Sequence, residues 1–307
     1  MMQVLILNEH DVTELLTMRE CIAVMEEALR ALGRGEVHNP LRQAIRAAGA
    51  PGLLGLMPAW RAGERPVYAL KEVCVFPDNP KRGLDSHLGT VILHSGETGE
   101  PLAIMNAAAI TAIRTAAVSA IATKLLARED ASVLAIVGSG VQSRTHAEAI
   151  PLVREIKEVR VASRRTELSV EQAVRGADII VTATSSREPV LRREWISPGA
   201  HVNAVGSSIA AARELDSETV AAASLFVDRR ESTVNESGDY LFAVKDYPGI
   251  EIKAELGELL LGTATGRSNA EELTLFKSLG LAVEDLAAAA FLYDKAKELG
   301  RGVTVEL

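Results

Sequence analysis

A short glycine-rich segment, Gly138-Ser139-Gly140-Val141-Gln142-Ser143, has the spacing of a loop that binds the phosphates of a dinucleotide. It follows the apolar run 133–137 and precedes a helical pattern, which is the context that such a loop requires. Gly138 permits a tight turn, Gly140 lets the backbone approach the pyrophosphate, and Ser143 is small enough for close packing of the helix. The N-terminal N–H groups of that helix favour phosphate. We predict a dinucleotide site rather than a plain strand–helix turn.

The end of the next strand indicates which dinucleotide binds. An NAD site carries Asp or Glu there, to accept hydrogen bonds from the ribose 2′-hydroxyl. This chain has Ser163, Arg164, Arg165 and Thr166 there, and the first carboxylate after the strand is Glu167. Guanidinium and hydroxyl groups bind a 2′-phosphate well, whereas the alternative is two solvated surface arginines. We therefore expect NADP(H) as the preferred cofactor, with NAD(H) possible.

A lysine lies among apolar residues on one face of a predicted strand. Lys71 lies in the run 67–76, which is apolar on both faces and is typical of an interior strand. A lysine on an apolar face can have a lowered pKa, which suits it to donate or accept a proton. The residues alone equally allow an ion-paired or snorkelling lysine.

Composition limits the class of protein. The chain has 307 residues, of which 48% are hydrophobic and 4% aromatic, so the core must be aliphatic. A formal charge of −8 argues against a nucleic-acid partner, which calls for a basic face. The six histidines show no ligand spacing, so we expect no metal.

Localisation is predicted from the termini, the cysteines and one apolar stretch. The first residues lack the charged start of a signal peptide. Cys21 and Cys74 form no framework, and we expect both to be small buried hydrophobes of a reducing compartment. Residues 101–127 are apolar but contain Arg114 and Lys124, so we expect a buried or domain-linking helix and no membrane span. The prediction is a cytoplasmic protein.

Hydrophobic periodicity predicts two kinds of architecture along the chain. The first region reads as α+β with a mostly antiparallel sheet: a helix at 11–34 and strands at 41–47, 53–57, 67–76, 88–94 and 102–105. After a helix at 109–127, strands and helices alternate: strands at 133–137, 159–163, 178–183, 200–205 and 225–228, with helices at 141–153, 169–175 and 215–223. Two helices, 268–279 and 281–299, complete the prediction.

The fold class predicted from this alternation is α/β, a doubly wound parallel (Rossmann) sheet plus an α+β domain for substrate binding and dimerisation. We expect residues 113–284 to form the dinucleotide-binding domain, and 1–112 with 285–307 to form the other. Few residues separate Arg165 from the helix at 169–175, so the crossover helix and third strand of a standard Rossmann half should be missing.

Seven segments in order resemble the ornithine cyclodeaminase/mu-crystallin family over nearly the whole chain. They are residues 110–117, 138–142 with His146, 176–184, 198–206, 236–239, 254–258 and 276–285. The resemblance implies a homodimer and a small imino- or amino-acid substrate, whose carboxylate is held by Arg42, Arg114 and Lys71. His146 is expected on a helix face rather than in catalysis.

We expect the cofactor to contact the glycine loop, the strand ends and the family motifs. These residues are Ser86, Arg114, Gly138, Ser139, Gly140, Val141, Gln142, Ser163, Arg164, Arg165, Thr166, Thr182, Ala183, Thr184, Val205, Gly206, Ser207 and Ser278.

Two positions depart from the pattern of ornithine cyclodeaminases, in which each holds a carboxylate. Gly55 stands where a glutamate receives the distal amine, and Ser208 stands where an acid serves as base. Ornithine cyclodeamination is therefore disfavoured. Ser208 resembles the mu-crystallin branch, so we predict NADPH-dependent reduction of a cyclic ketimine such as Δ1-pyrroline-2-carboxylate, with Ser208 bonding the substrate or a water. The alternatives are an alanine or other amino-acid dehydrogenase, an ornithine cyclodeaminase, and a non-catalytic NADP(H)- or ligand-binding protein.

Overall fold

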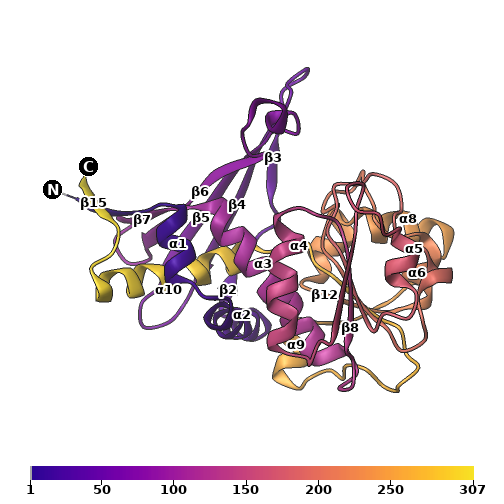
Figure 1. Cartoon of the computed structure of the whole chain (residues 1–307). Helices are drawn as coiled ribbons and strands as arrows, with labels where there is room; N and C mark the ends of the chain where they lie inside the picture. The colour runs from indigo at the N-terminus through magenta and orange to yellow at the C-terminus, as the bar shows by residue number, and fades with distance from the viewer. Residues whose placement is uncertain (1) are drawn as a thin grey trace. The chain divides into compact units, whose positions relative to one another are not determined.

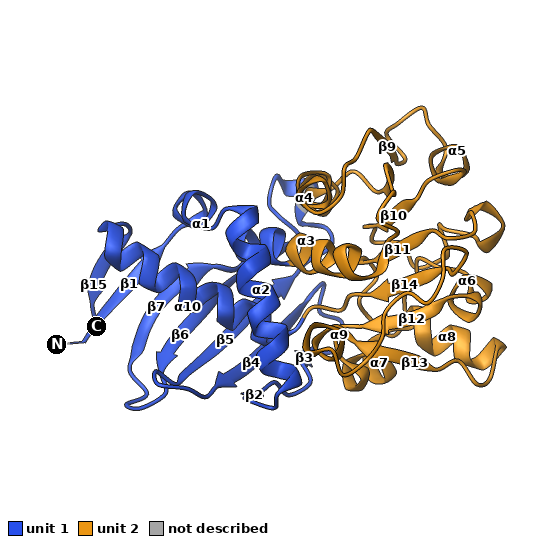
Figure 2. Ribbon diagram, turned by 90° about the horizontal axis from the view of Figure 1, so that it is seen from below, with its two compact units in different colours: residues 1–114, 281–307 blue, residues 115–280 orange. Residues whose placement is uncertain are grey.

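The computed structural model describes residues 2–307 and divides them into two compact units (Figure 2). Unit 1 holds the residues up to Arg114 together with Leu281–Leu307, and unit 2 is Thr115–Gly280. The sequence placed these boundaries at 112/113 and 284/285. Helix α3 (Ala107–Leu126) continues from one unit into the other (Figure 1), as expected of a domain-linking helix. Its length and composition would suffice to cross a membrane, yet 72% of its most apolar window is buried in the protein.

Unit 1 is built on one sheet of strand order β15-β1-β7-β6-β5-β4-β2, with β3 paired to β4 beside this path. The strands are β1 (Gln3–Leu7), β2 (Val37–His38), β3 (Gln43–Ile45), β4 (Leu53–Arg61), β5 (Val67–Val75), β6 (His87–Ser95), β7 (Pro101–Asn106) and β15 (Val303–Glu306), and a 3-10 turn spans Asn79–Arg82. The β1–β7 pair is parallel and the other pairs are antiparallel, which confirms the mostly antiparallel sheet.

Helices cover one face of this sheet. Figure 2 shows α2 (Met18–Gly33) and α10 (Ala282–Leu299) lying across it, and α10 packs on β4, β5 and β6. The single helix predicted over 11–34 was wrong. The chain forms α1 (Glu9–Leu15) and then α2, because the Thr17 side chain accepts the Glu20 backbone N–H and Glu20 returns a bond to Thr17, a capping box that starts a new helix.

The opposite face of the sheet is not covered by a helix of unit 1. Alternate residues of β5 point there, so Tyr68 and Cys74 are exposed while Ala69 and Lys71 are buried beneath α10. The expectation that both cysteines are buried was therefore half wrong: Cys21 is buried, and Cys74 is exposed because of its place in the strand's alternation.

Unit 2 contains a sheet of strand order β13-β12-β14-β11-β10-β8-β9 in which every pairing is parallel. Its strands are β8 (Val133–Val137), β9 (Glu158–Ala162), β10 (Ile179–Thr182), β11 (His201–Ala204), β12 (Ser224–Val227), β13 (Ile252–Glu255) and β14 (Thr274–Lys277). Its helices are α4 (Val141–Ala149), α5 (Val170–Val174), α6 (Ser217–Ala222), α7 (Arg230–Glu236), α8 (Gly238–Asp246) and α9 (Leu256–Leu261), with 3-10 turns at Ile150–Leu152 and Arg193–Trp195. This sheet confirms the predicted doubly wound fold.

Two details of this sheet bear on the predictions. The helix predicted over 268–279 was wrong: that segment contains β14, which is buried along its whole length between β11 and β12. A short apolar run fits a buried strand and a buried helix equally well. β9 ends the sheet, with only the one-and-a-half-turn α5 between it and β10, so the expected loss of the third strand is confirmed.

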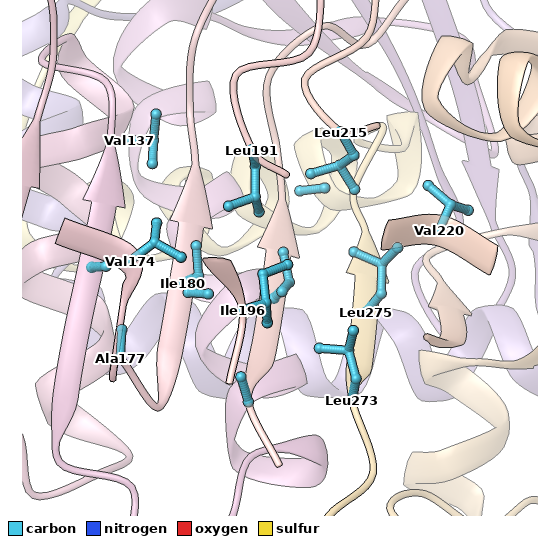
Figure 3. Close-up of a cluster of buried hydrophobic side chains, with 14 of the residues drawn as sticks. Val137, Val174, Ala177, Ile180, Leu191, Ile196, Leu215, Val220, Leu273 and Leu275 are labelled. Carbon is cyan, nitrogen blue, oxygen red and sulfur yellow. The ribbon is translucent and has the colours of Figure 1, made fainter. Parts of the chain in front are cut away.

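The core of unit 2 is aliphatic, as composition required. Figure 3 shows Ile180, Leu191, Leu215 and Leu275 meeting in a cluster whose fully buried members are all Ala, Val, Leu or Ile. Polar groups are also buried within the sheet, where His201 contacts the Thr274 hydroxyl and Asn203 donates to the Thr123 hydroxyl.

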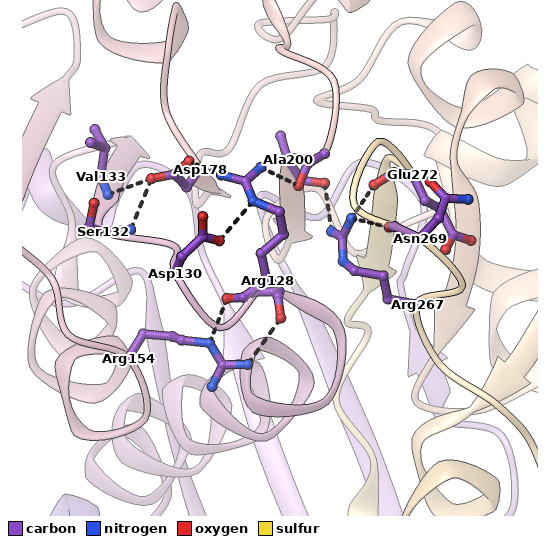
Figure 4. A network of polar contacts seen from close by, with 12 residues as sticks. Arg128, Asp130, Ser132, Val133, Arg154, Asp178, Ala200, Arg267, Asn269 and Glu272 are labelled. Atoms are coloured by element: carbon purple, nitrogen blue, oxygen red, sulfur yellow. Dashed lines mark hydrogen bonds and ion pairs between the residues drawn. The ribbon is translucent and has the colours of Figure 1, made fainter.

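Three arginines tie together the amino ends of the parallel strands (Figure 4). Arg128 bonds Asp178 and the Gly199 carbonyl, Arg154 bonds the carbonyl of Arg128, and Arg267 bonds the carbonyl of Ala200. Because this edge is filled by its own ion pairs, the carboxyl ends of the strands are the edge that remains for a ligand.

Candidate functional site

The first turn of α10 carries a pair of acids that bind two of the predicted catalytic cations. Lys71 Nζ lies 2.6 Å from Asp285 Oδ2, Arg114 Nε donates to Asp285 Oδ1 at 3.2 Å, and Arg114 Nη1 donates to Glu284 Oε2 at 2.7 Å. All four side chains are buried, and all belong to unit 1. Asn39 Oδ1 accepts the backbone N–H of Val283 at 2.8 Å and thereby holds this turn in place.

Arg42 adds a third cation to this group. Gln43 pairs with Leu56, so the register puts Arg42 opposite Met57, and Met57 in turn pairs with Lys71. The Arg42 charge also acts on Lys71, lowering its pKa. The three predicted cations therefore lie near one another and near two carboxylates, and guanidinium groups suit a ligand carboxylate.

The electrostatics of Lys71 are those of an acid–base group. Burial lowers the pKa of Lys71 to about 8, the Asp285 charge opposes that effect, and the charges of Arg114 and Arg42 add to it. Burial would raise the pKa of Asp285, but Arg114 and Lys71 outweigh it and hold that pKa below its ordinary value. Asp285 therefore stays ionised and keeps Lys71 oriented while the ammonium remains able to lose its proton.

Sequence reasoning gave no role to Glu284 or Asp285, although it singled out their motif. The available signal was two acids inside the apolar run 281–290, because buried carboxylates require buried cations as partners. His87 was also missed. It lies on the Lys71 face of the sheet, bonds Ser86 at 2.9 Å, and has a pKa lowered by burial and by the Lys71 charge.

The glycine loop of unit 2 has the shape that a dinucleotide needs. Gly138 has φ +129°, and a Cβ there would lie 2.5 Å from the Ala183 carbonyl oxygen, so only glycine fits. Gly140 precedes α4 with open space where a Cβ would stand, and Ser143 is buried in the place of the third glycine. The N-terminal turn of α4 is thus open to a pyrophosphate, and the residues fit the group.

The loop after β9 holds the two arginines predicted to read the 2′-phosphate. The Ser163 N–H donates to Thr166 Oγ at 2.7 Å and the Arg165 N–H to Ser163 Oγ at 3.0 Å, which closes a tight turn. The Arg164 and Arg165 side chains are exposed, and neither has an ion-pair partner within residues 2–307. They are positioned as solvent-facing cations.

The remaining predicted cofactor residues of unit 2 follow the carboxyl ends of neighbouring parallel strands. Thr182 ends β10 and Ala183 and Thr184 follow it. Val205 to Ser207 follow β11, and Ser278 follows β14, where its N–H donates to the Ala204 carbonyl. Ser208 is half-buried at the end of the β11 turn. Ser86 and Arg114, by contrast, belong to unit 1.

His146 lies on the buried face of α4. Its Nδ1 contacts the Gln142 carbonyl at 2.7 Å and its Nε2 contacts Ser119 Oγ at 2.9 Å. Burial lowers its pKa to about 4, so the ring is neutral at pH 7 and supports the glycine-loop helix.

Known proteins match nearly the whole of this chain. The sequence pattern of the ornithine cyclodeaminase/mu-crystallin family matches residues 2–169 and 165–300. The ketimine reductase mu-crystallin of Mus musculus is 42% identical over 292 residues, covering 89% of this chain and 91% of the mouse protein.

Two solved structures share the whole fold. Δ1-Pyrroline-2-carboxylate reductase of Thermococcus litoralis, in complex with NADH and L-proline, superposes with a TM-score of 0.92 at 38% identity, covering 98% of this chain and 100% of that one. An archaeal alanine dehydrogenase dimer with bound NAD superposes with a TM-score of 0.93 at 34% identity, covering 100% of both chains.

Proposed function

The chain belongs to the ornithine cyclodeaminase/mu-crystallin family, and we propose that it reduces a cyclic α-imino acid, such as Δ1-pyrroline-2-carboxylate, to an L-amino acid with NADPH. The observation that carries this proposal is the buried cluster of Lys71, Arg114, Glu284 and Asp285, which contains a lysine of lowered pKa. The enzyme is an oxidoreductase acting on C=N bonds with a nicotinamide cofactor.

The residues of this cluster have different roles in imine reduction. Arg42 and Arg114 neutralise the α-carboxylate of the substrate, with planar guanidinium groups that suit a carboxylate. Lys71, held by Asp285, binds the same carboxylate and keeps a proton on the imine nitrogen, so that the carbon is an electrophile. A bound dihydronicotinamide supplies the hydride. Ser208 bonds the substrate or an ordered water.

The neighbouring row of the sheet favours an uncharged substrate ring. Gly55 and Val73 pair directly, one row beyond Met57 and Lys71 on the same face, and neither offers a carboxylate for a second ammonium. Cyclodeamination of ornithine therefore lacks its distal-amine partner, and Ser208 cannot act as a carboxylate base. The similarity to an alanine dehydrogenase keeps reductive amination of a keto acid as the second candidate.

We further propose NADP(H) as the preferred cofactor. Arg164 and Arg165 present two exposed guanidinium groups just after β9, where a 2′-phosphate would be recognised. No carboxylate stands between the end of β9 and Glu167.

We propose a homodimer formed through the uncovered face of the unit 1 sheet. Pro58, Trp60, Tyr68, Leu70 and Ile92 lie on this face, and Tyr68 is 50% exposed. Contiguous apolar surface on a sheet is typical of an obligate interface. The similar archaeal alanine dehydrogenase is a dimer.

Steady-state assays with Δ1-pyrroline-2-carboxylate, pyruvate plus ammonium, and L-ornithine test the reaction, each with NADPH or NADH. We expect the cyclic imine to give the highest kcat/KM. Lys71→Met should lower that value by about 10²–10⁴-fold without changing NADPH affinity, because it removes the proton donor. Lys295→Met, which removes a lysine paired with Glu20 in the same unit, is the control. No oxidation of NADPH by the imine would refute the proposal.

The pH profile tests the role of Asp285. We expect kcat/KM to fall above about pH 8, where Lys71 loses its proton. Asp285→Asn removes the charge that raises the pKa of Lys71, so the falling limb should move to lower pH. Asp294→Asn, which breaks the exposed pair with Arg65, should leave the limb in place. A limb that Asp285→Asn does not move would belong to another group.

Cofactor choice is tested by replacing both Arg164 and Arg165 with Ala. NADPH binding, followed by fluorescence, should weaken about tenfold or more, because two charge-assisted contacts to the phosphate are lost. NADH binding should change less than about twofold. Arg175→Ala, which removes an exposed arginine of the same unit, serves as the control. Equal losses for both cofactors would contradict recognition of the 2′-phosphate.

The dimer is tested by sedimentation of Tyr68→Asp. We expect the unchanged protein to sediment with twice the chain mass, and the variant with the mass of one chain, because a buried unpaired carboxylate opposes association. Tyr247→Asp, at a tyrosine that is 44% exposed in unit 2, should leave the dimer intact. A wild-type monomer, or a dimeric Tyr68→Asp variant, would argue against this face.

A further inference from the structure

The turn that leads from β11 to Ser208 is held in an unusual conformation. Among residues 2–307, Ser207 is the only non-glycine residue with a positive φ, at +52°. Its hydroxyl donates to the Ser186 carbonyl. A Cβ on the preceding Gly206 would lie 2.1 Å from the Thr184 carbonyl oxygen, so the turns after β10 and β11 touch there. A strained backbone of this kind persists only where its surroundings hold it.

A buried lysine, Lys277, donates a hydrogen bond to the backbone of this turn. Lys277, at the end of β14, is 1% exposed, and its Nζ donates to the Gly206 carbonyl at 2.9 Å. The same ammonium lies 2.9 Å from Asp239 Oδ2. Asp239 is 3% exposed and stands in the first turn of α8, so one ion pair joins a central strand, a helix and the turn.

The Asp239 carboxylate also bonds the backbone at Glu214 and Leu215. Asp239 Oδ1 accepts the backbone N–H groups of Glu214 and Leu215 at 2.8 and 2.9 Å. Glu214, with no exposed surface, accepts the Thr184 N–H at 2.6 Å and the Thr182 hydroxyl at 2.8 Å. Every carboxylate oxygen of the pair is thus used by a backbone group, a hydroxyl or the lysine.

The charges of Lys277, Asp239 and Glu214 influence one another. Burial and the Asp239 charge raise the pKa of Glu214, and the Lys277 charge opposes them. Loss of Lys277 would leave two buried acids without a cation, which is costly in an apolar interior. Nothing in the reaction itself uses these three residues, yet they bond both turns that carry predicted cofactor contacts.

We propose that Lys277, Asp239 and Glu214 form a buried anchor that positions the turns at 182–184 and 205–208 against the nicotinamide half of the cofactor. This proposal rests on the proposed function, because it requires a bound nicotinamide cofactor whose nicotinamide half lies beside these turns. The three are positioning residues: they act through Gly206, Ser207 and Thr184 and touch no reacting atom.

The test compares Lys277→Met with the charge-balanced double variant Lys277→Met/Asp239→Asn. In both, NADPH binding should weaken at least fivefold and single-turnover hydride transfer to the imine should slow at least tenfold. Affinity for 2′,5′-ADP, which lacks the nicotinamide half, should change less than about twofold. Only the single variant should lose thermal stability, because the double variant restores the charge balance. NADH with ADP-ribose is measured as a parallel pair.

The control is Lys253→Met, which removes an exposed lysine paired with Glu272 and should change none of these quantities. Recovery of NADPH affinity and hydride transfer in the double variant would overturn the proposal, since Lys277 would then only neutralise Asp239. Equal weakening of NADPH and 2′,5′-ADP would overturn it too. If wild type reduces no imine, the proposed function fails, and the two binding measurements still decide the anchor.

Discussion

The burial of the Lys71 ammonium against the Asp285 carboxylate is the interaction on which the candidate chemistry depends. A lysine in an apolar interior tends to lose its charge, and a carboxylate there tends to gain a proton. Together, with Arg114 bound to the same carboxylate, both stay ionised, at a lysine pKa near the working range of an acid–base catalyst. The contact requires a central strand and the last long helix to meet, so the rest of unit 1 serves to bring them together.

In unit 2, different polar groups lie at the amino ends and at the carboxyl ends of the parallel strands. At the amino ends of the strands, Arg128, Arg154 and Arg267 bond carbonyl groups and Asp178, which closes that edge (Figure 4). At the carboxyl ends, the chain leaves glycines, hydroxyls and two exposed arginines. A parallel sheet directs the positive ends of the following helices to this edge, so it suits an anionic dinucleotide. An aliphatic cluster lies between these two ends of the strands (Figure 3).

Local patterns predicted most elements but failed where two structures fit one pattern. The segment 268–279 was interpreted as a helix, yet its centre is the buried strand β14. Residues 11–34 were predicted as one helix because the apolar spacing continues across the end of α1. The capping box of Thr17 and Glu20 shows that a second helix begins there. Cys74 was predicted buried as a small hydrophobe, but the strand places it on the face that no helix of unit 1 covers. Each of these choices depends on packing partners distant in the chain.

The sequence by itself determined the dinucleotide loop and the parallel sheet around it, because these depend on local spacing and residue type. The cations Arg42, Lys71 and Arg114 were named together only by what the family resemblance implies. Only the tertiary structure decided what those cations contact. Asp285 stands 214 positions beyond Lys71, since 285 − 71 = 214, and only the return of the chain into unit 1 brings the two within 2.6 Å. The Lys277–Asp239–Glu214 anchor is likewise invisible in the sequence. A sequence pattern can indicate that an acid is buried, but which cation it pairs with is decided only by the folded chain.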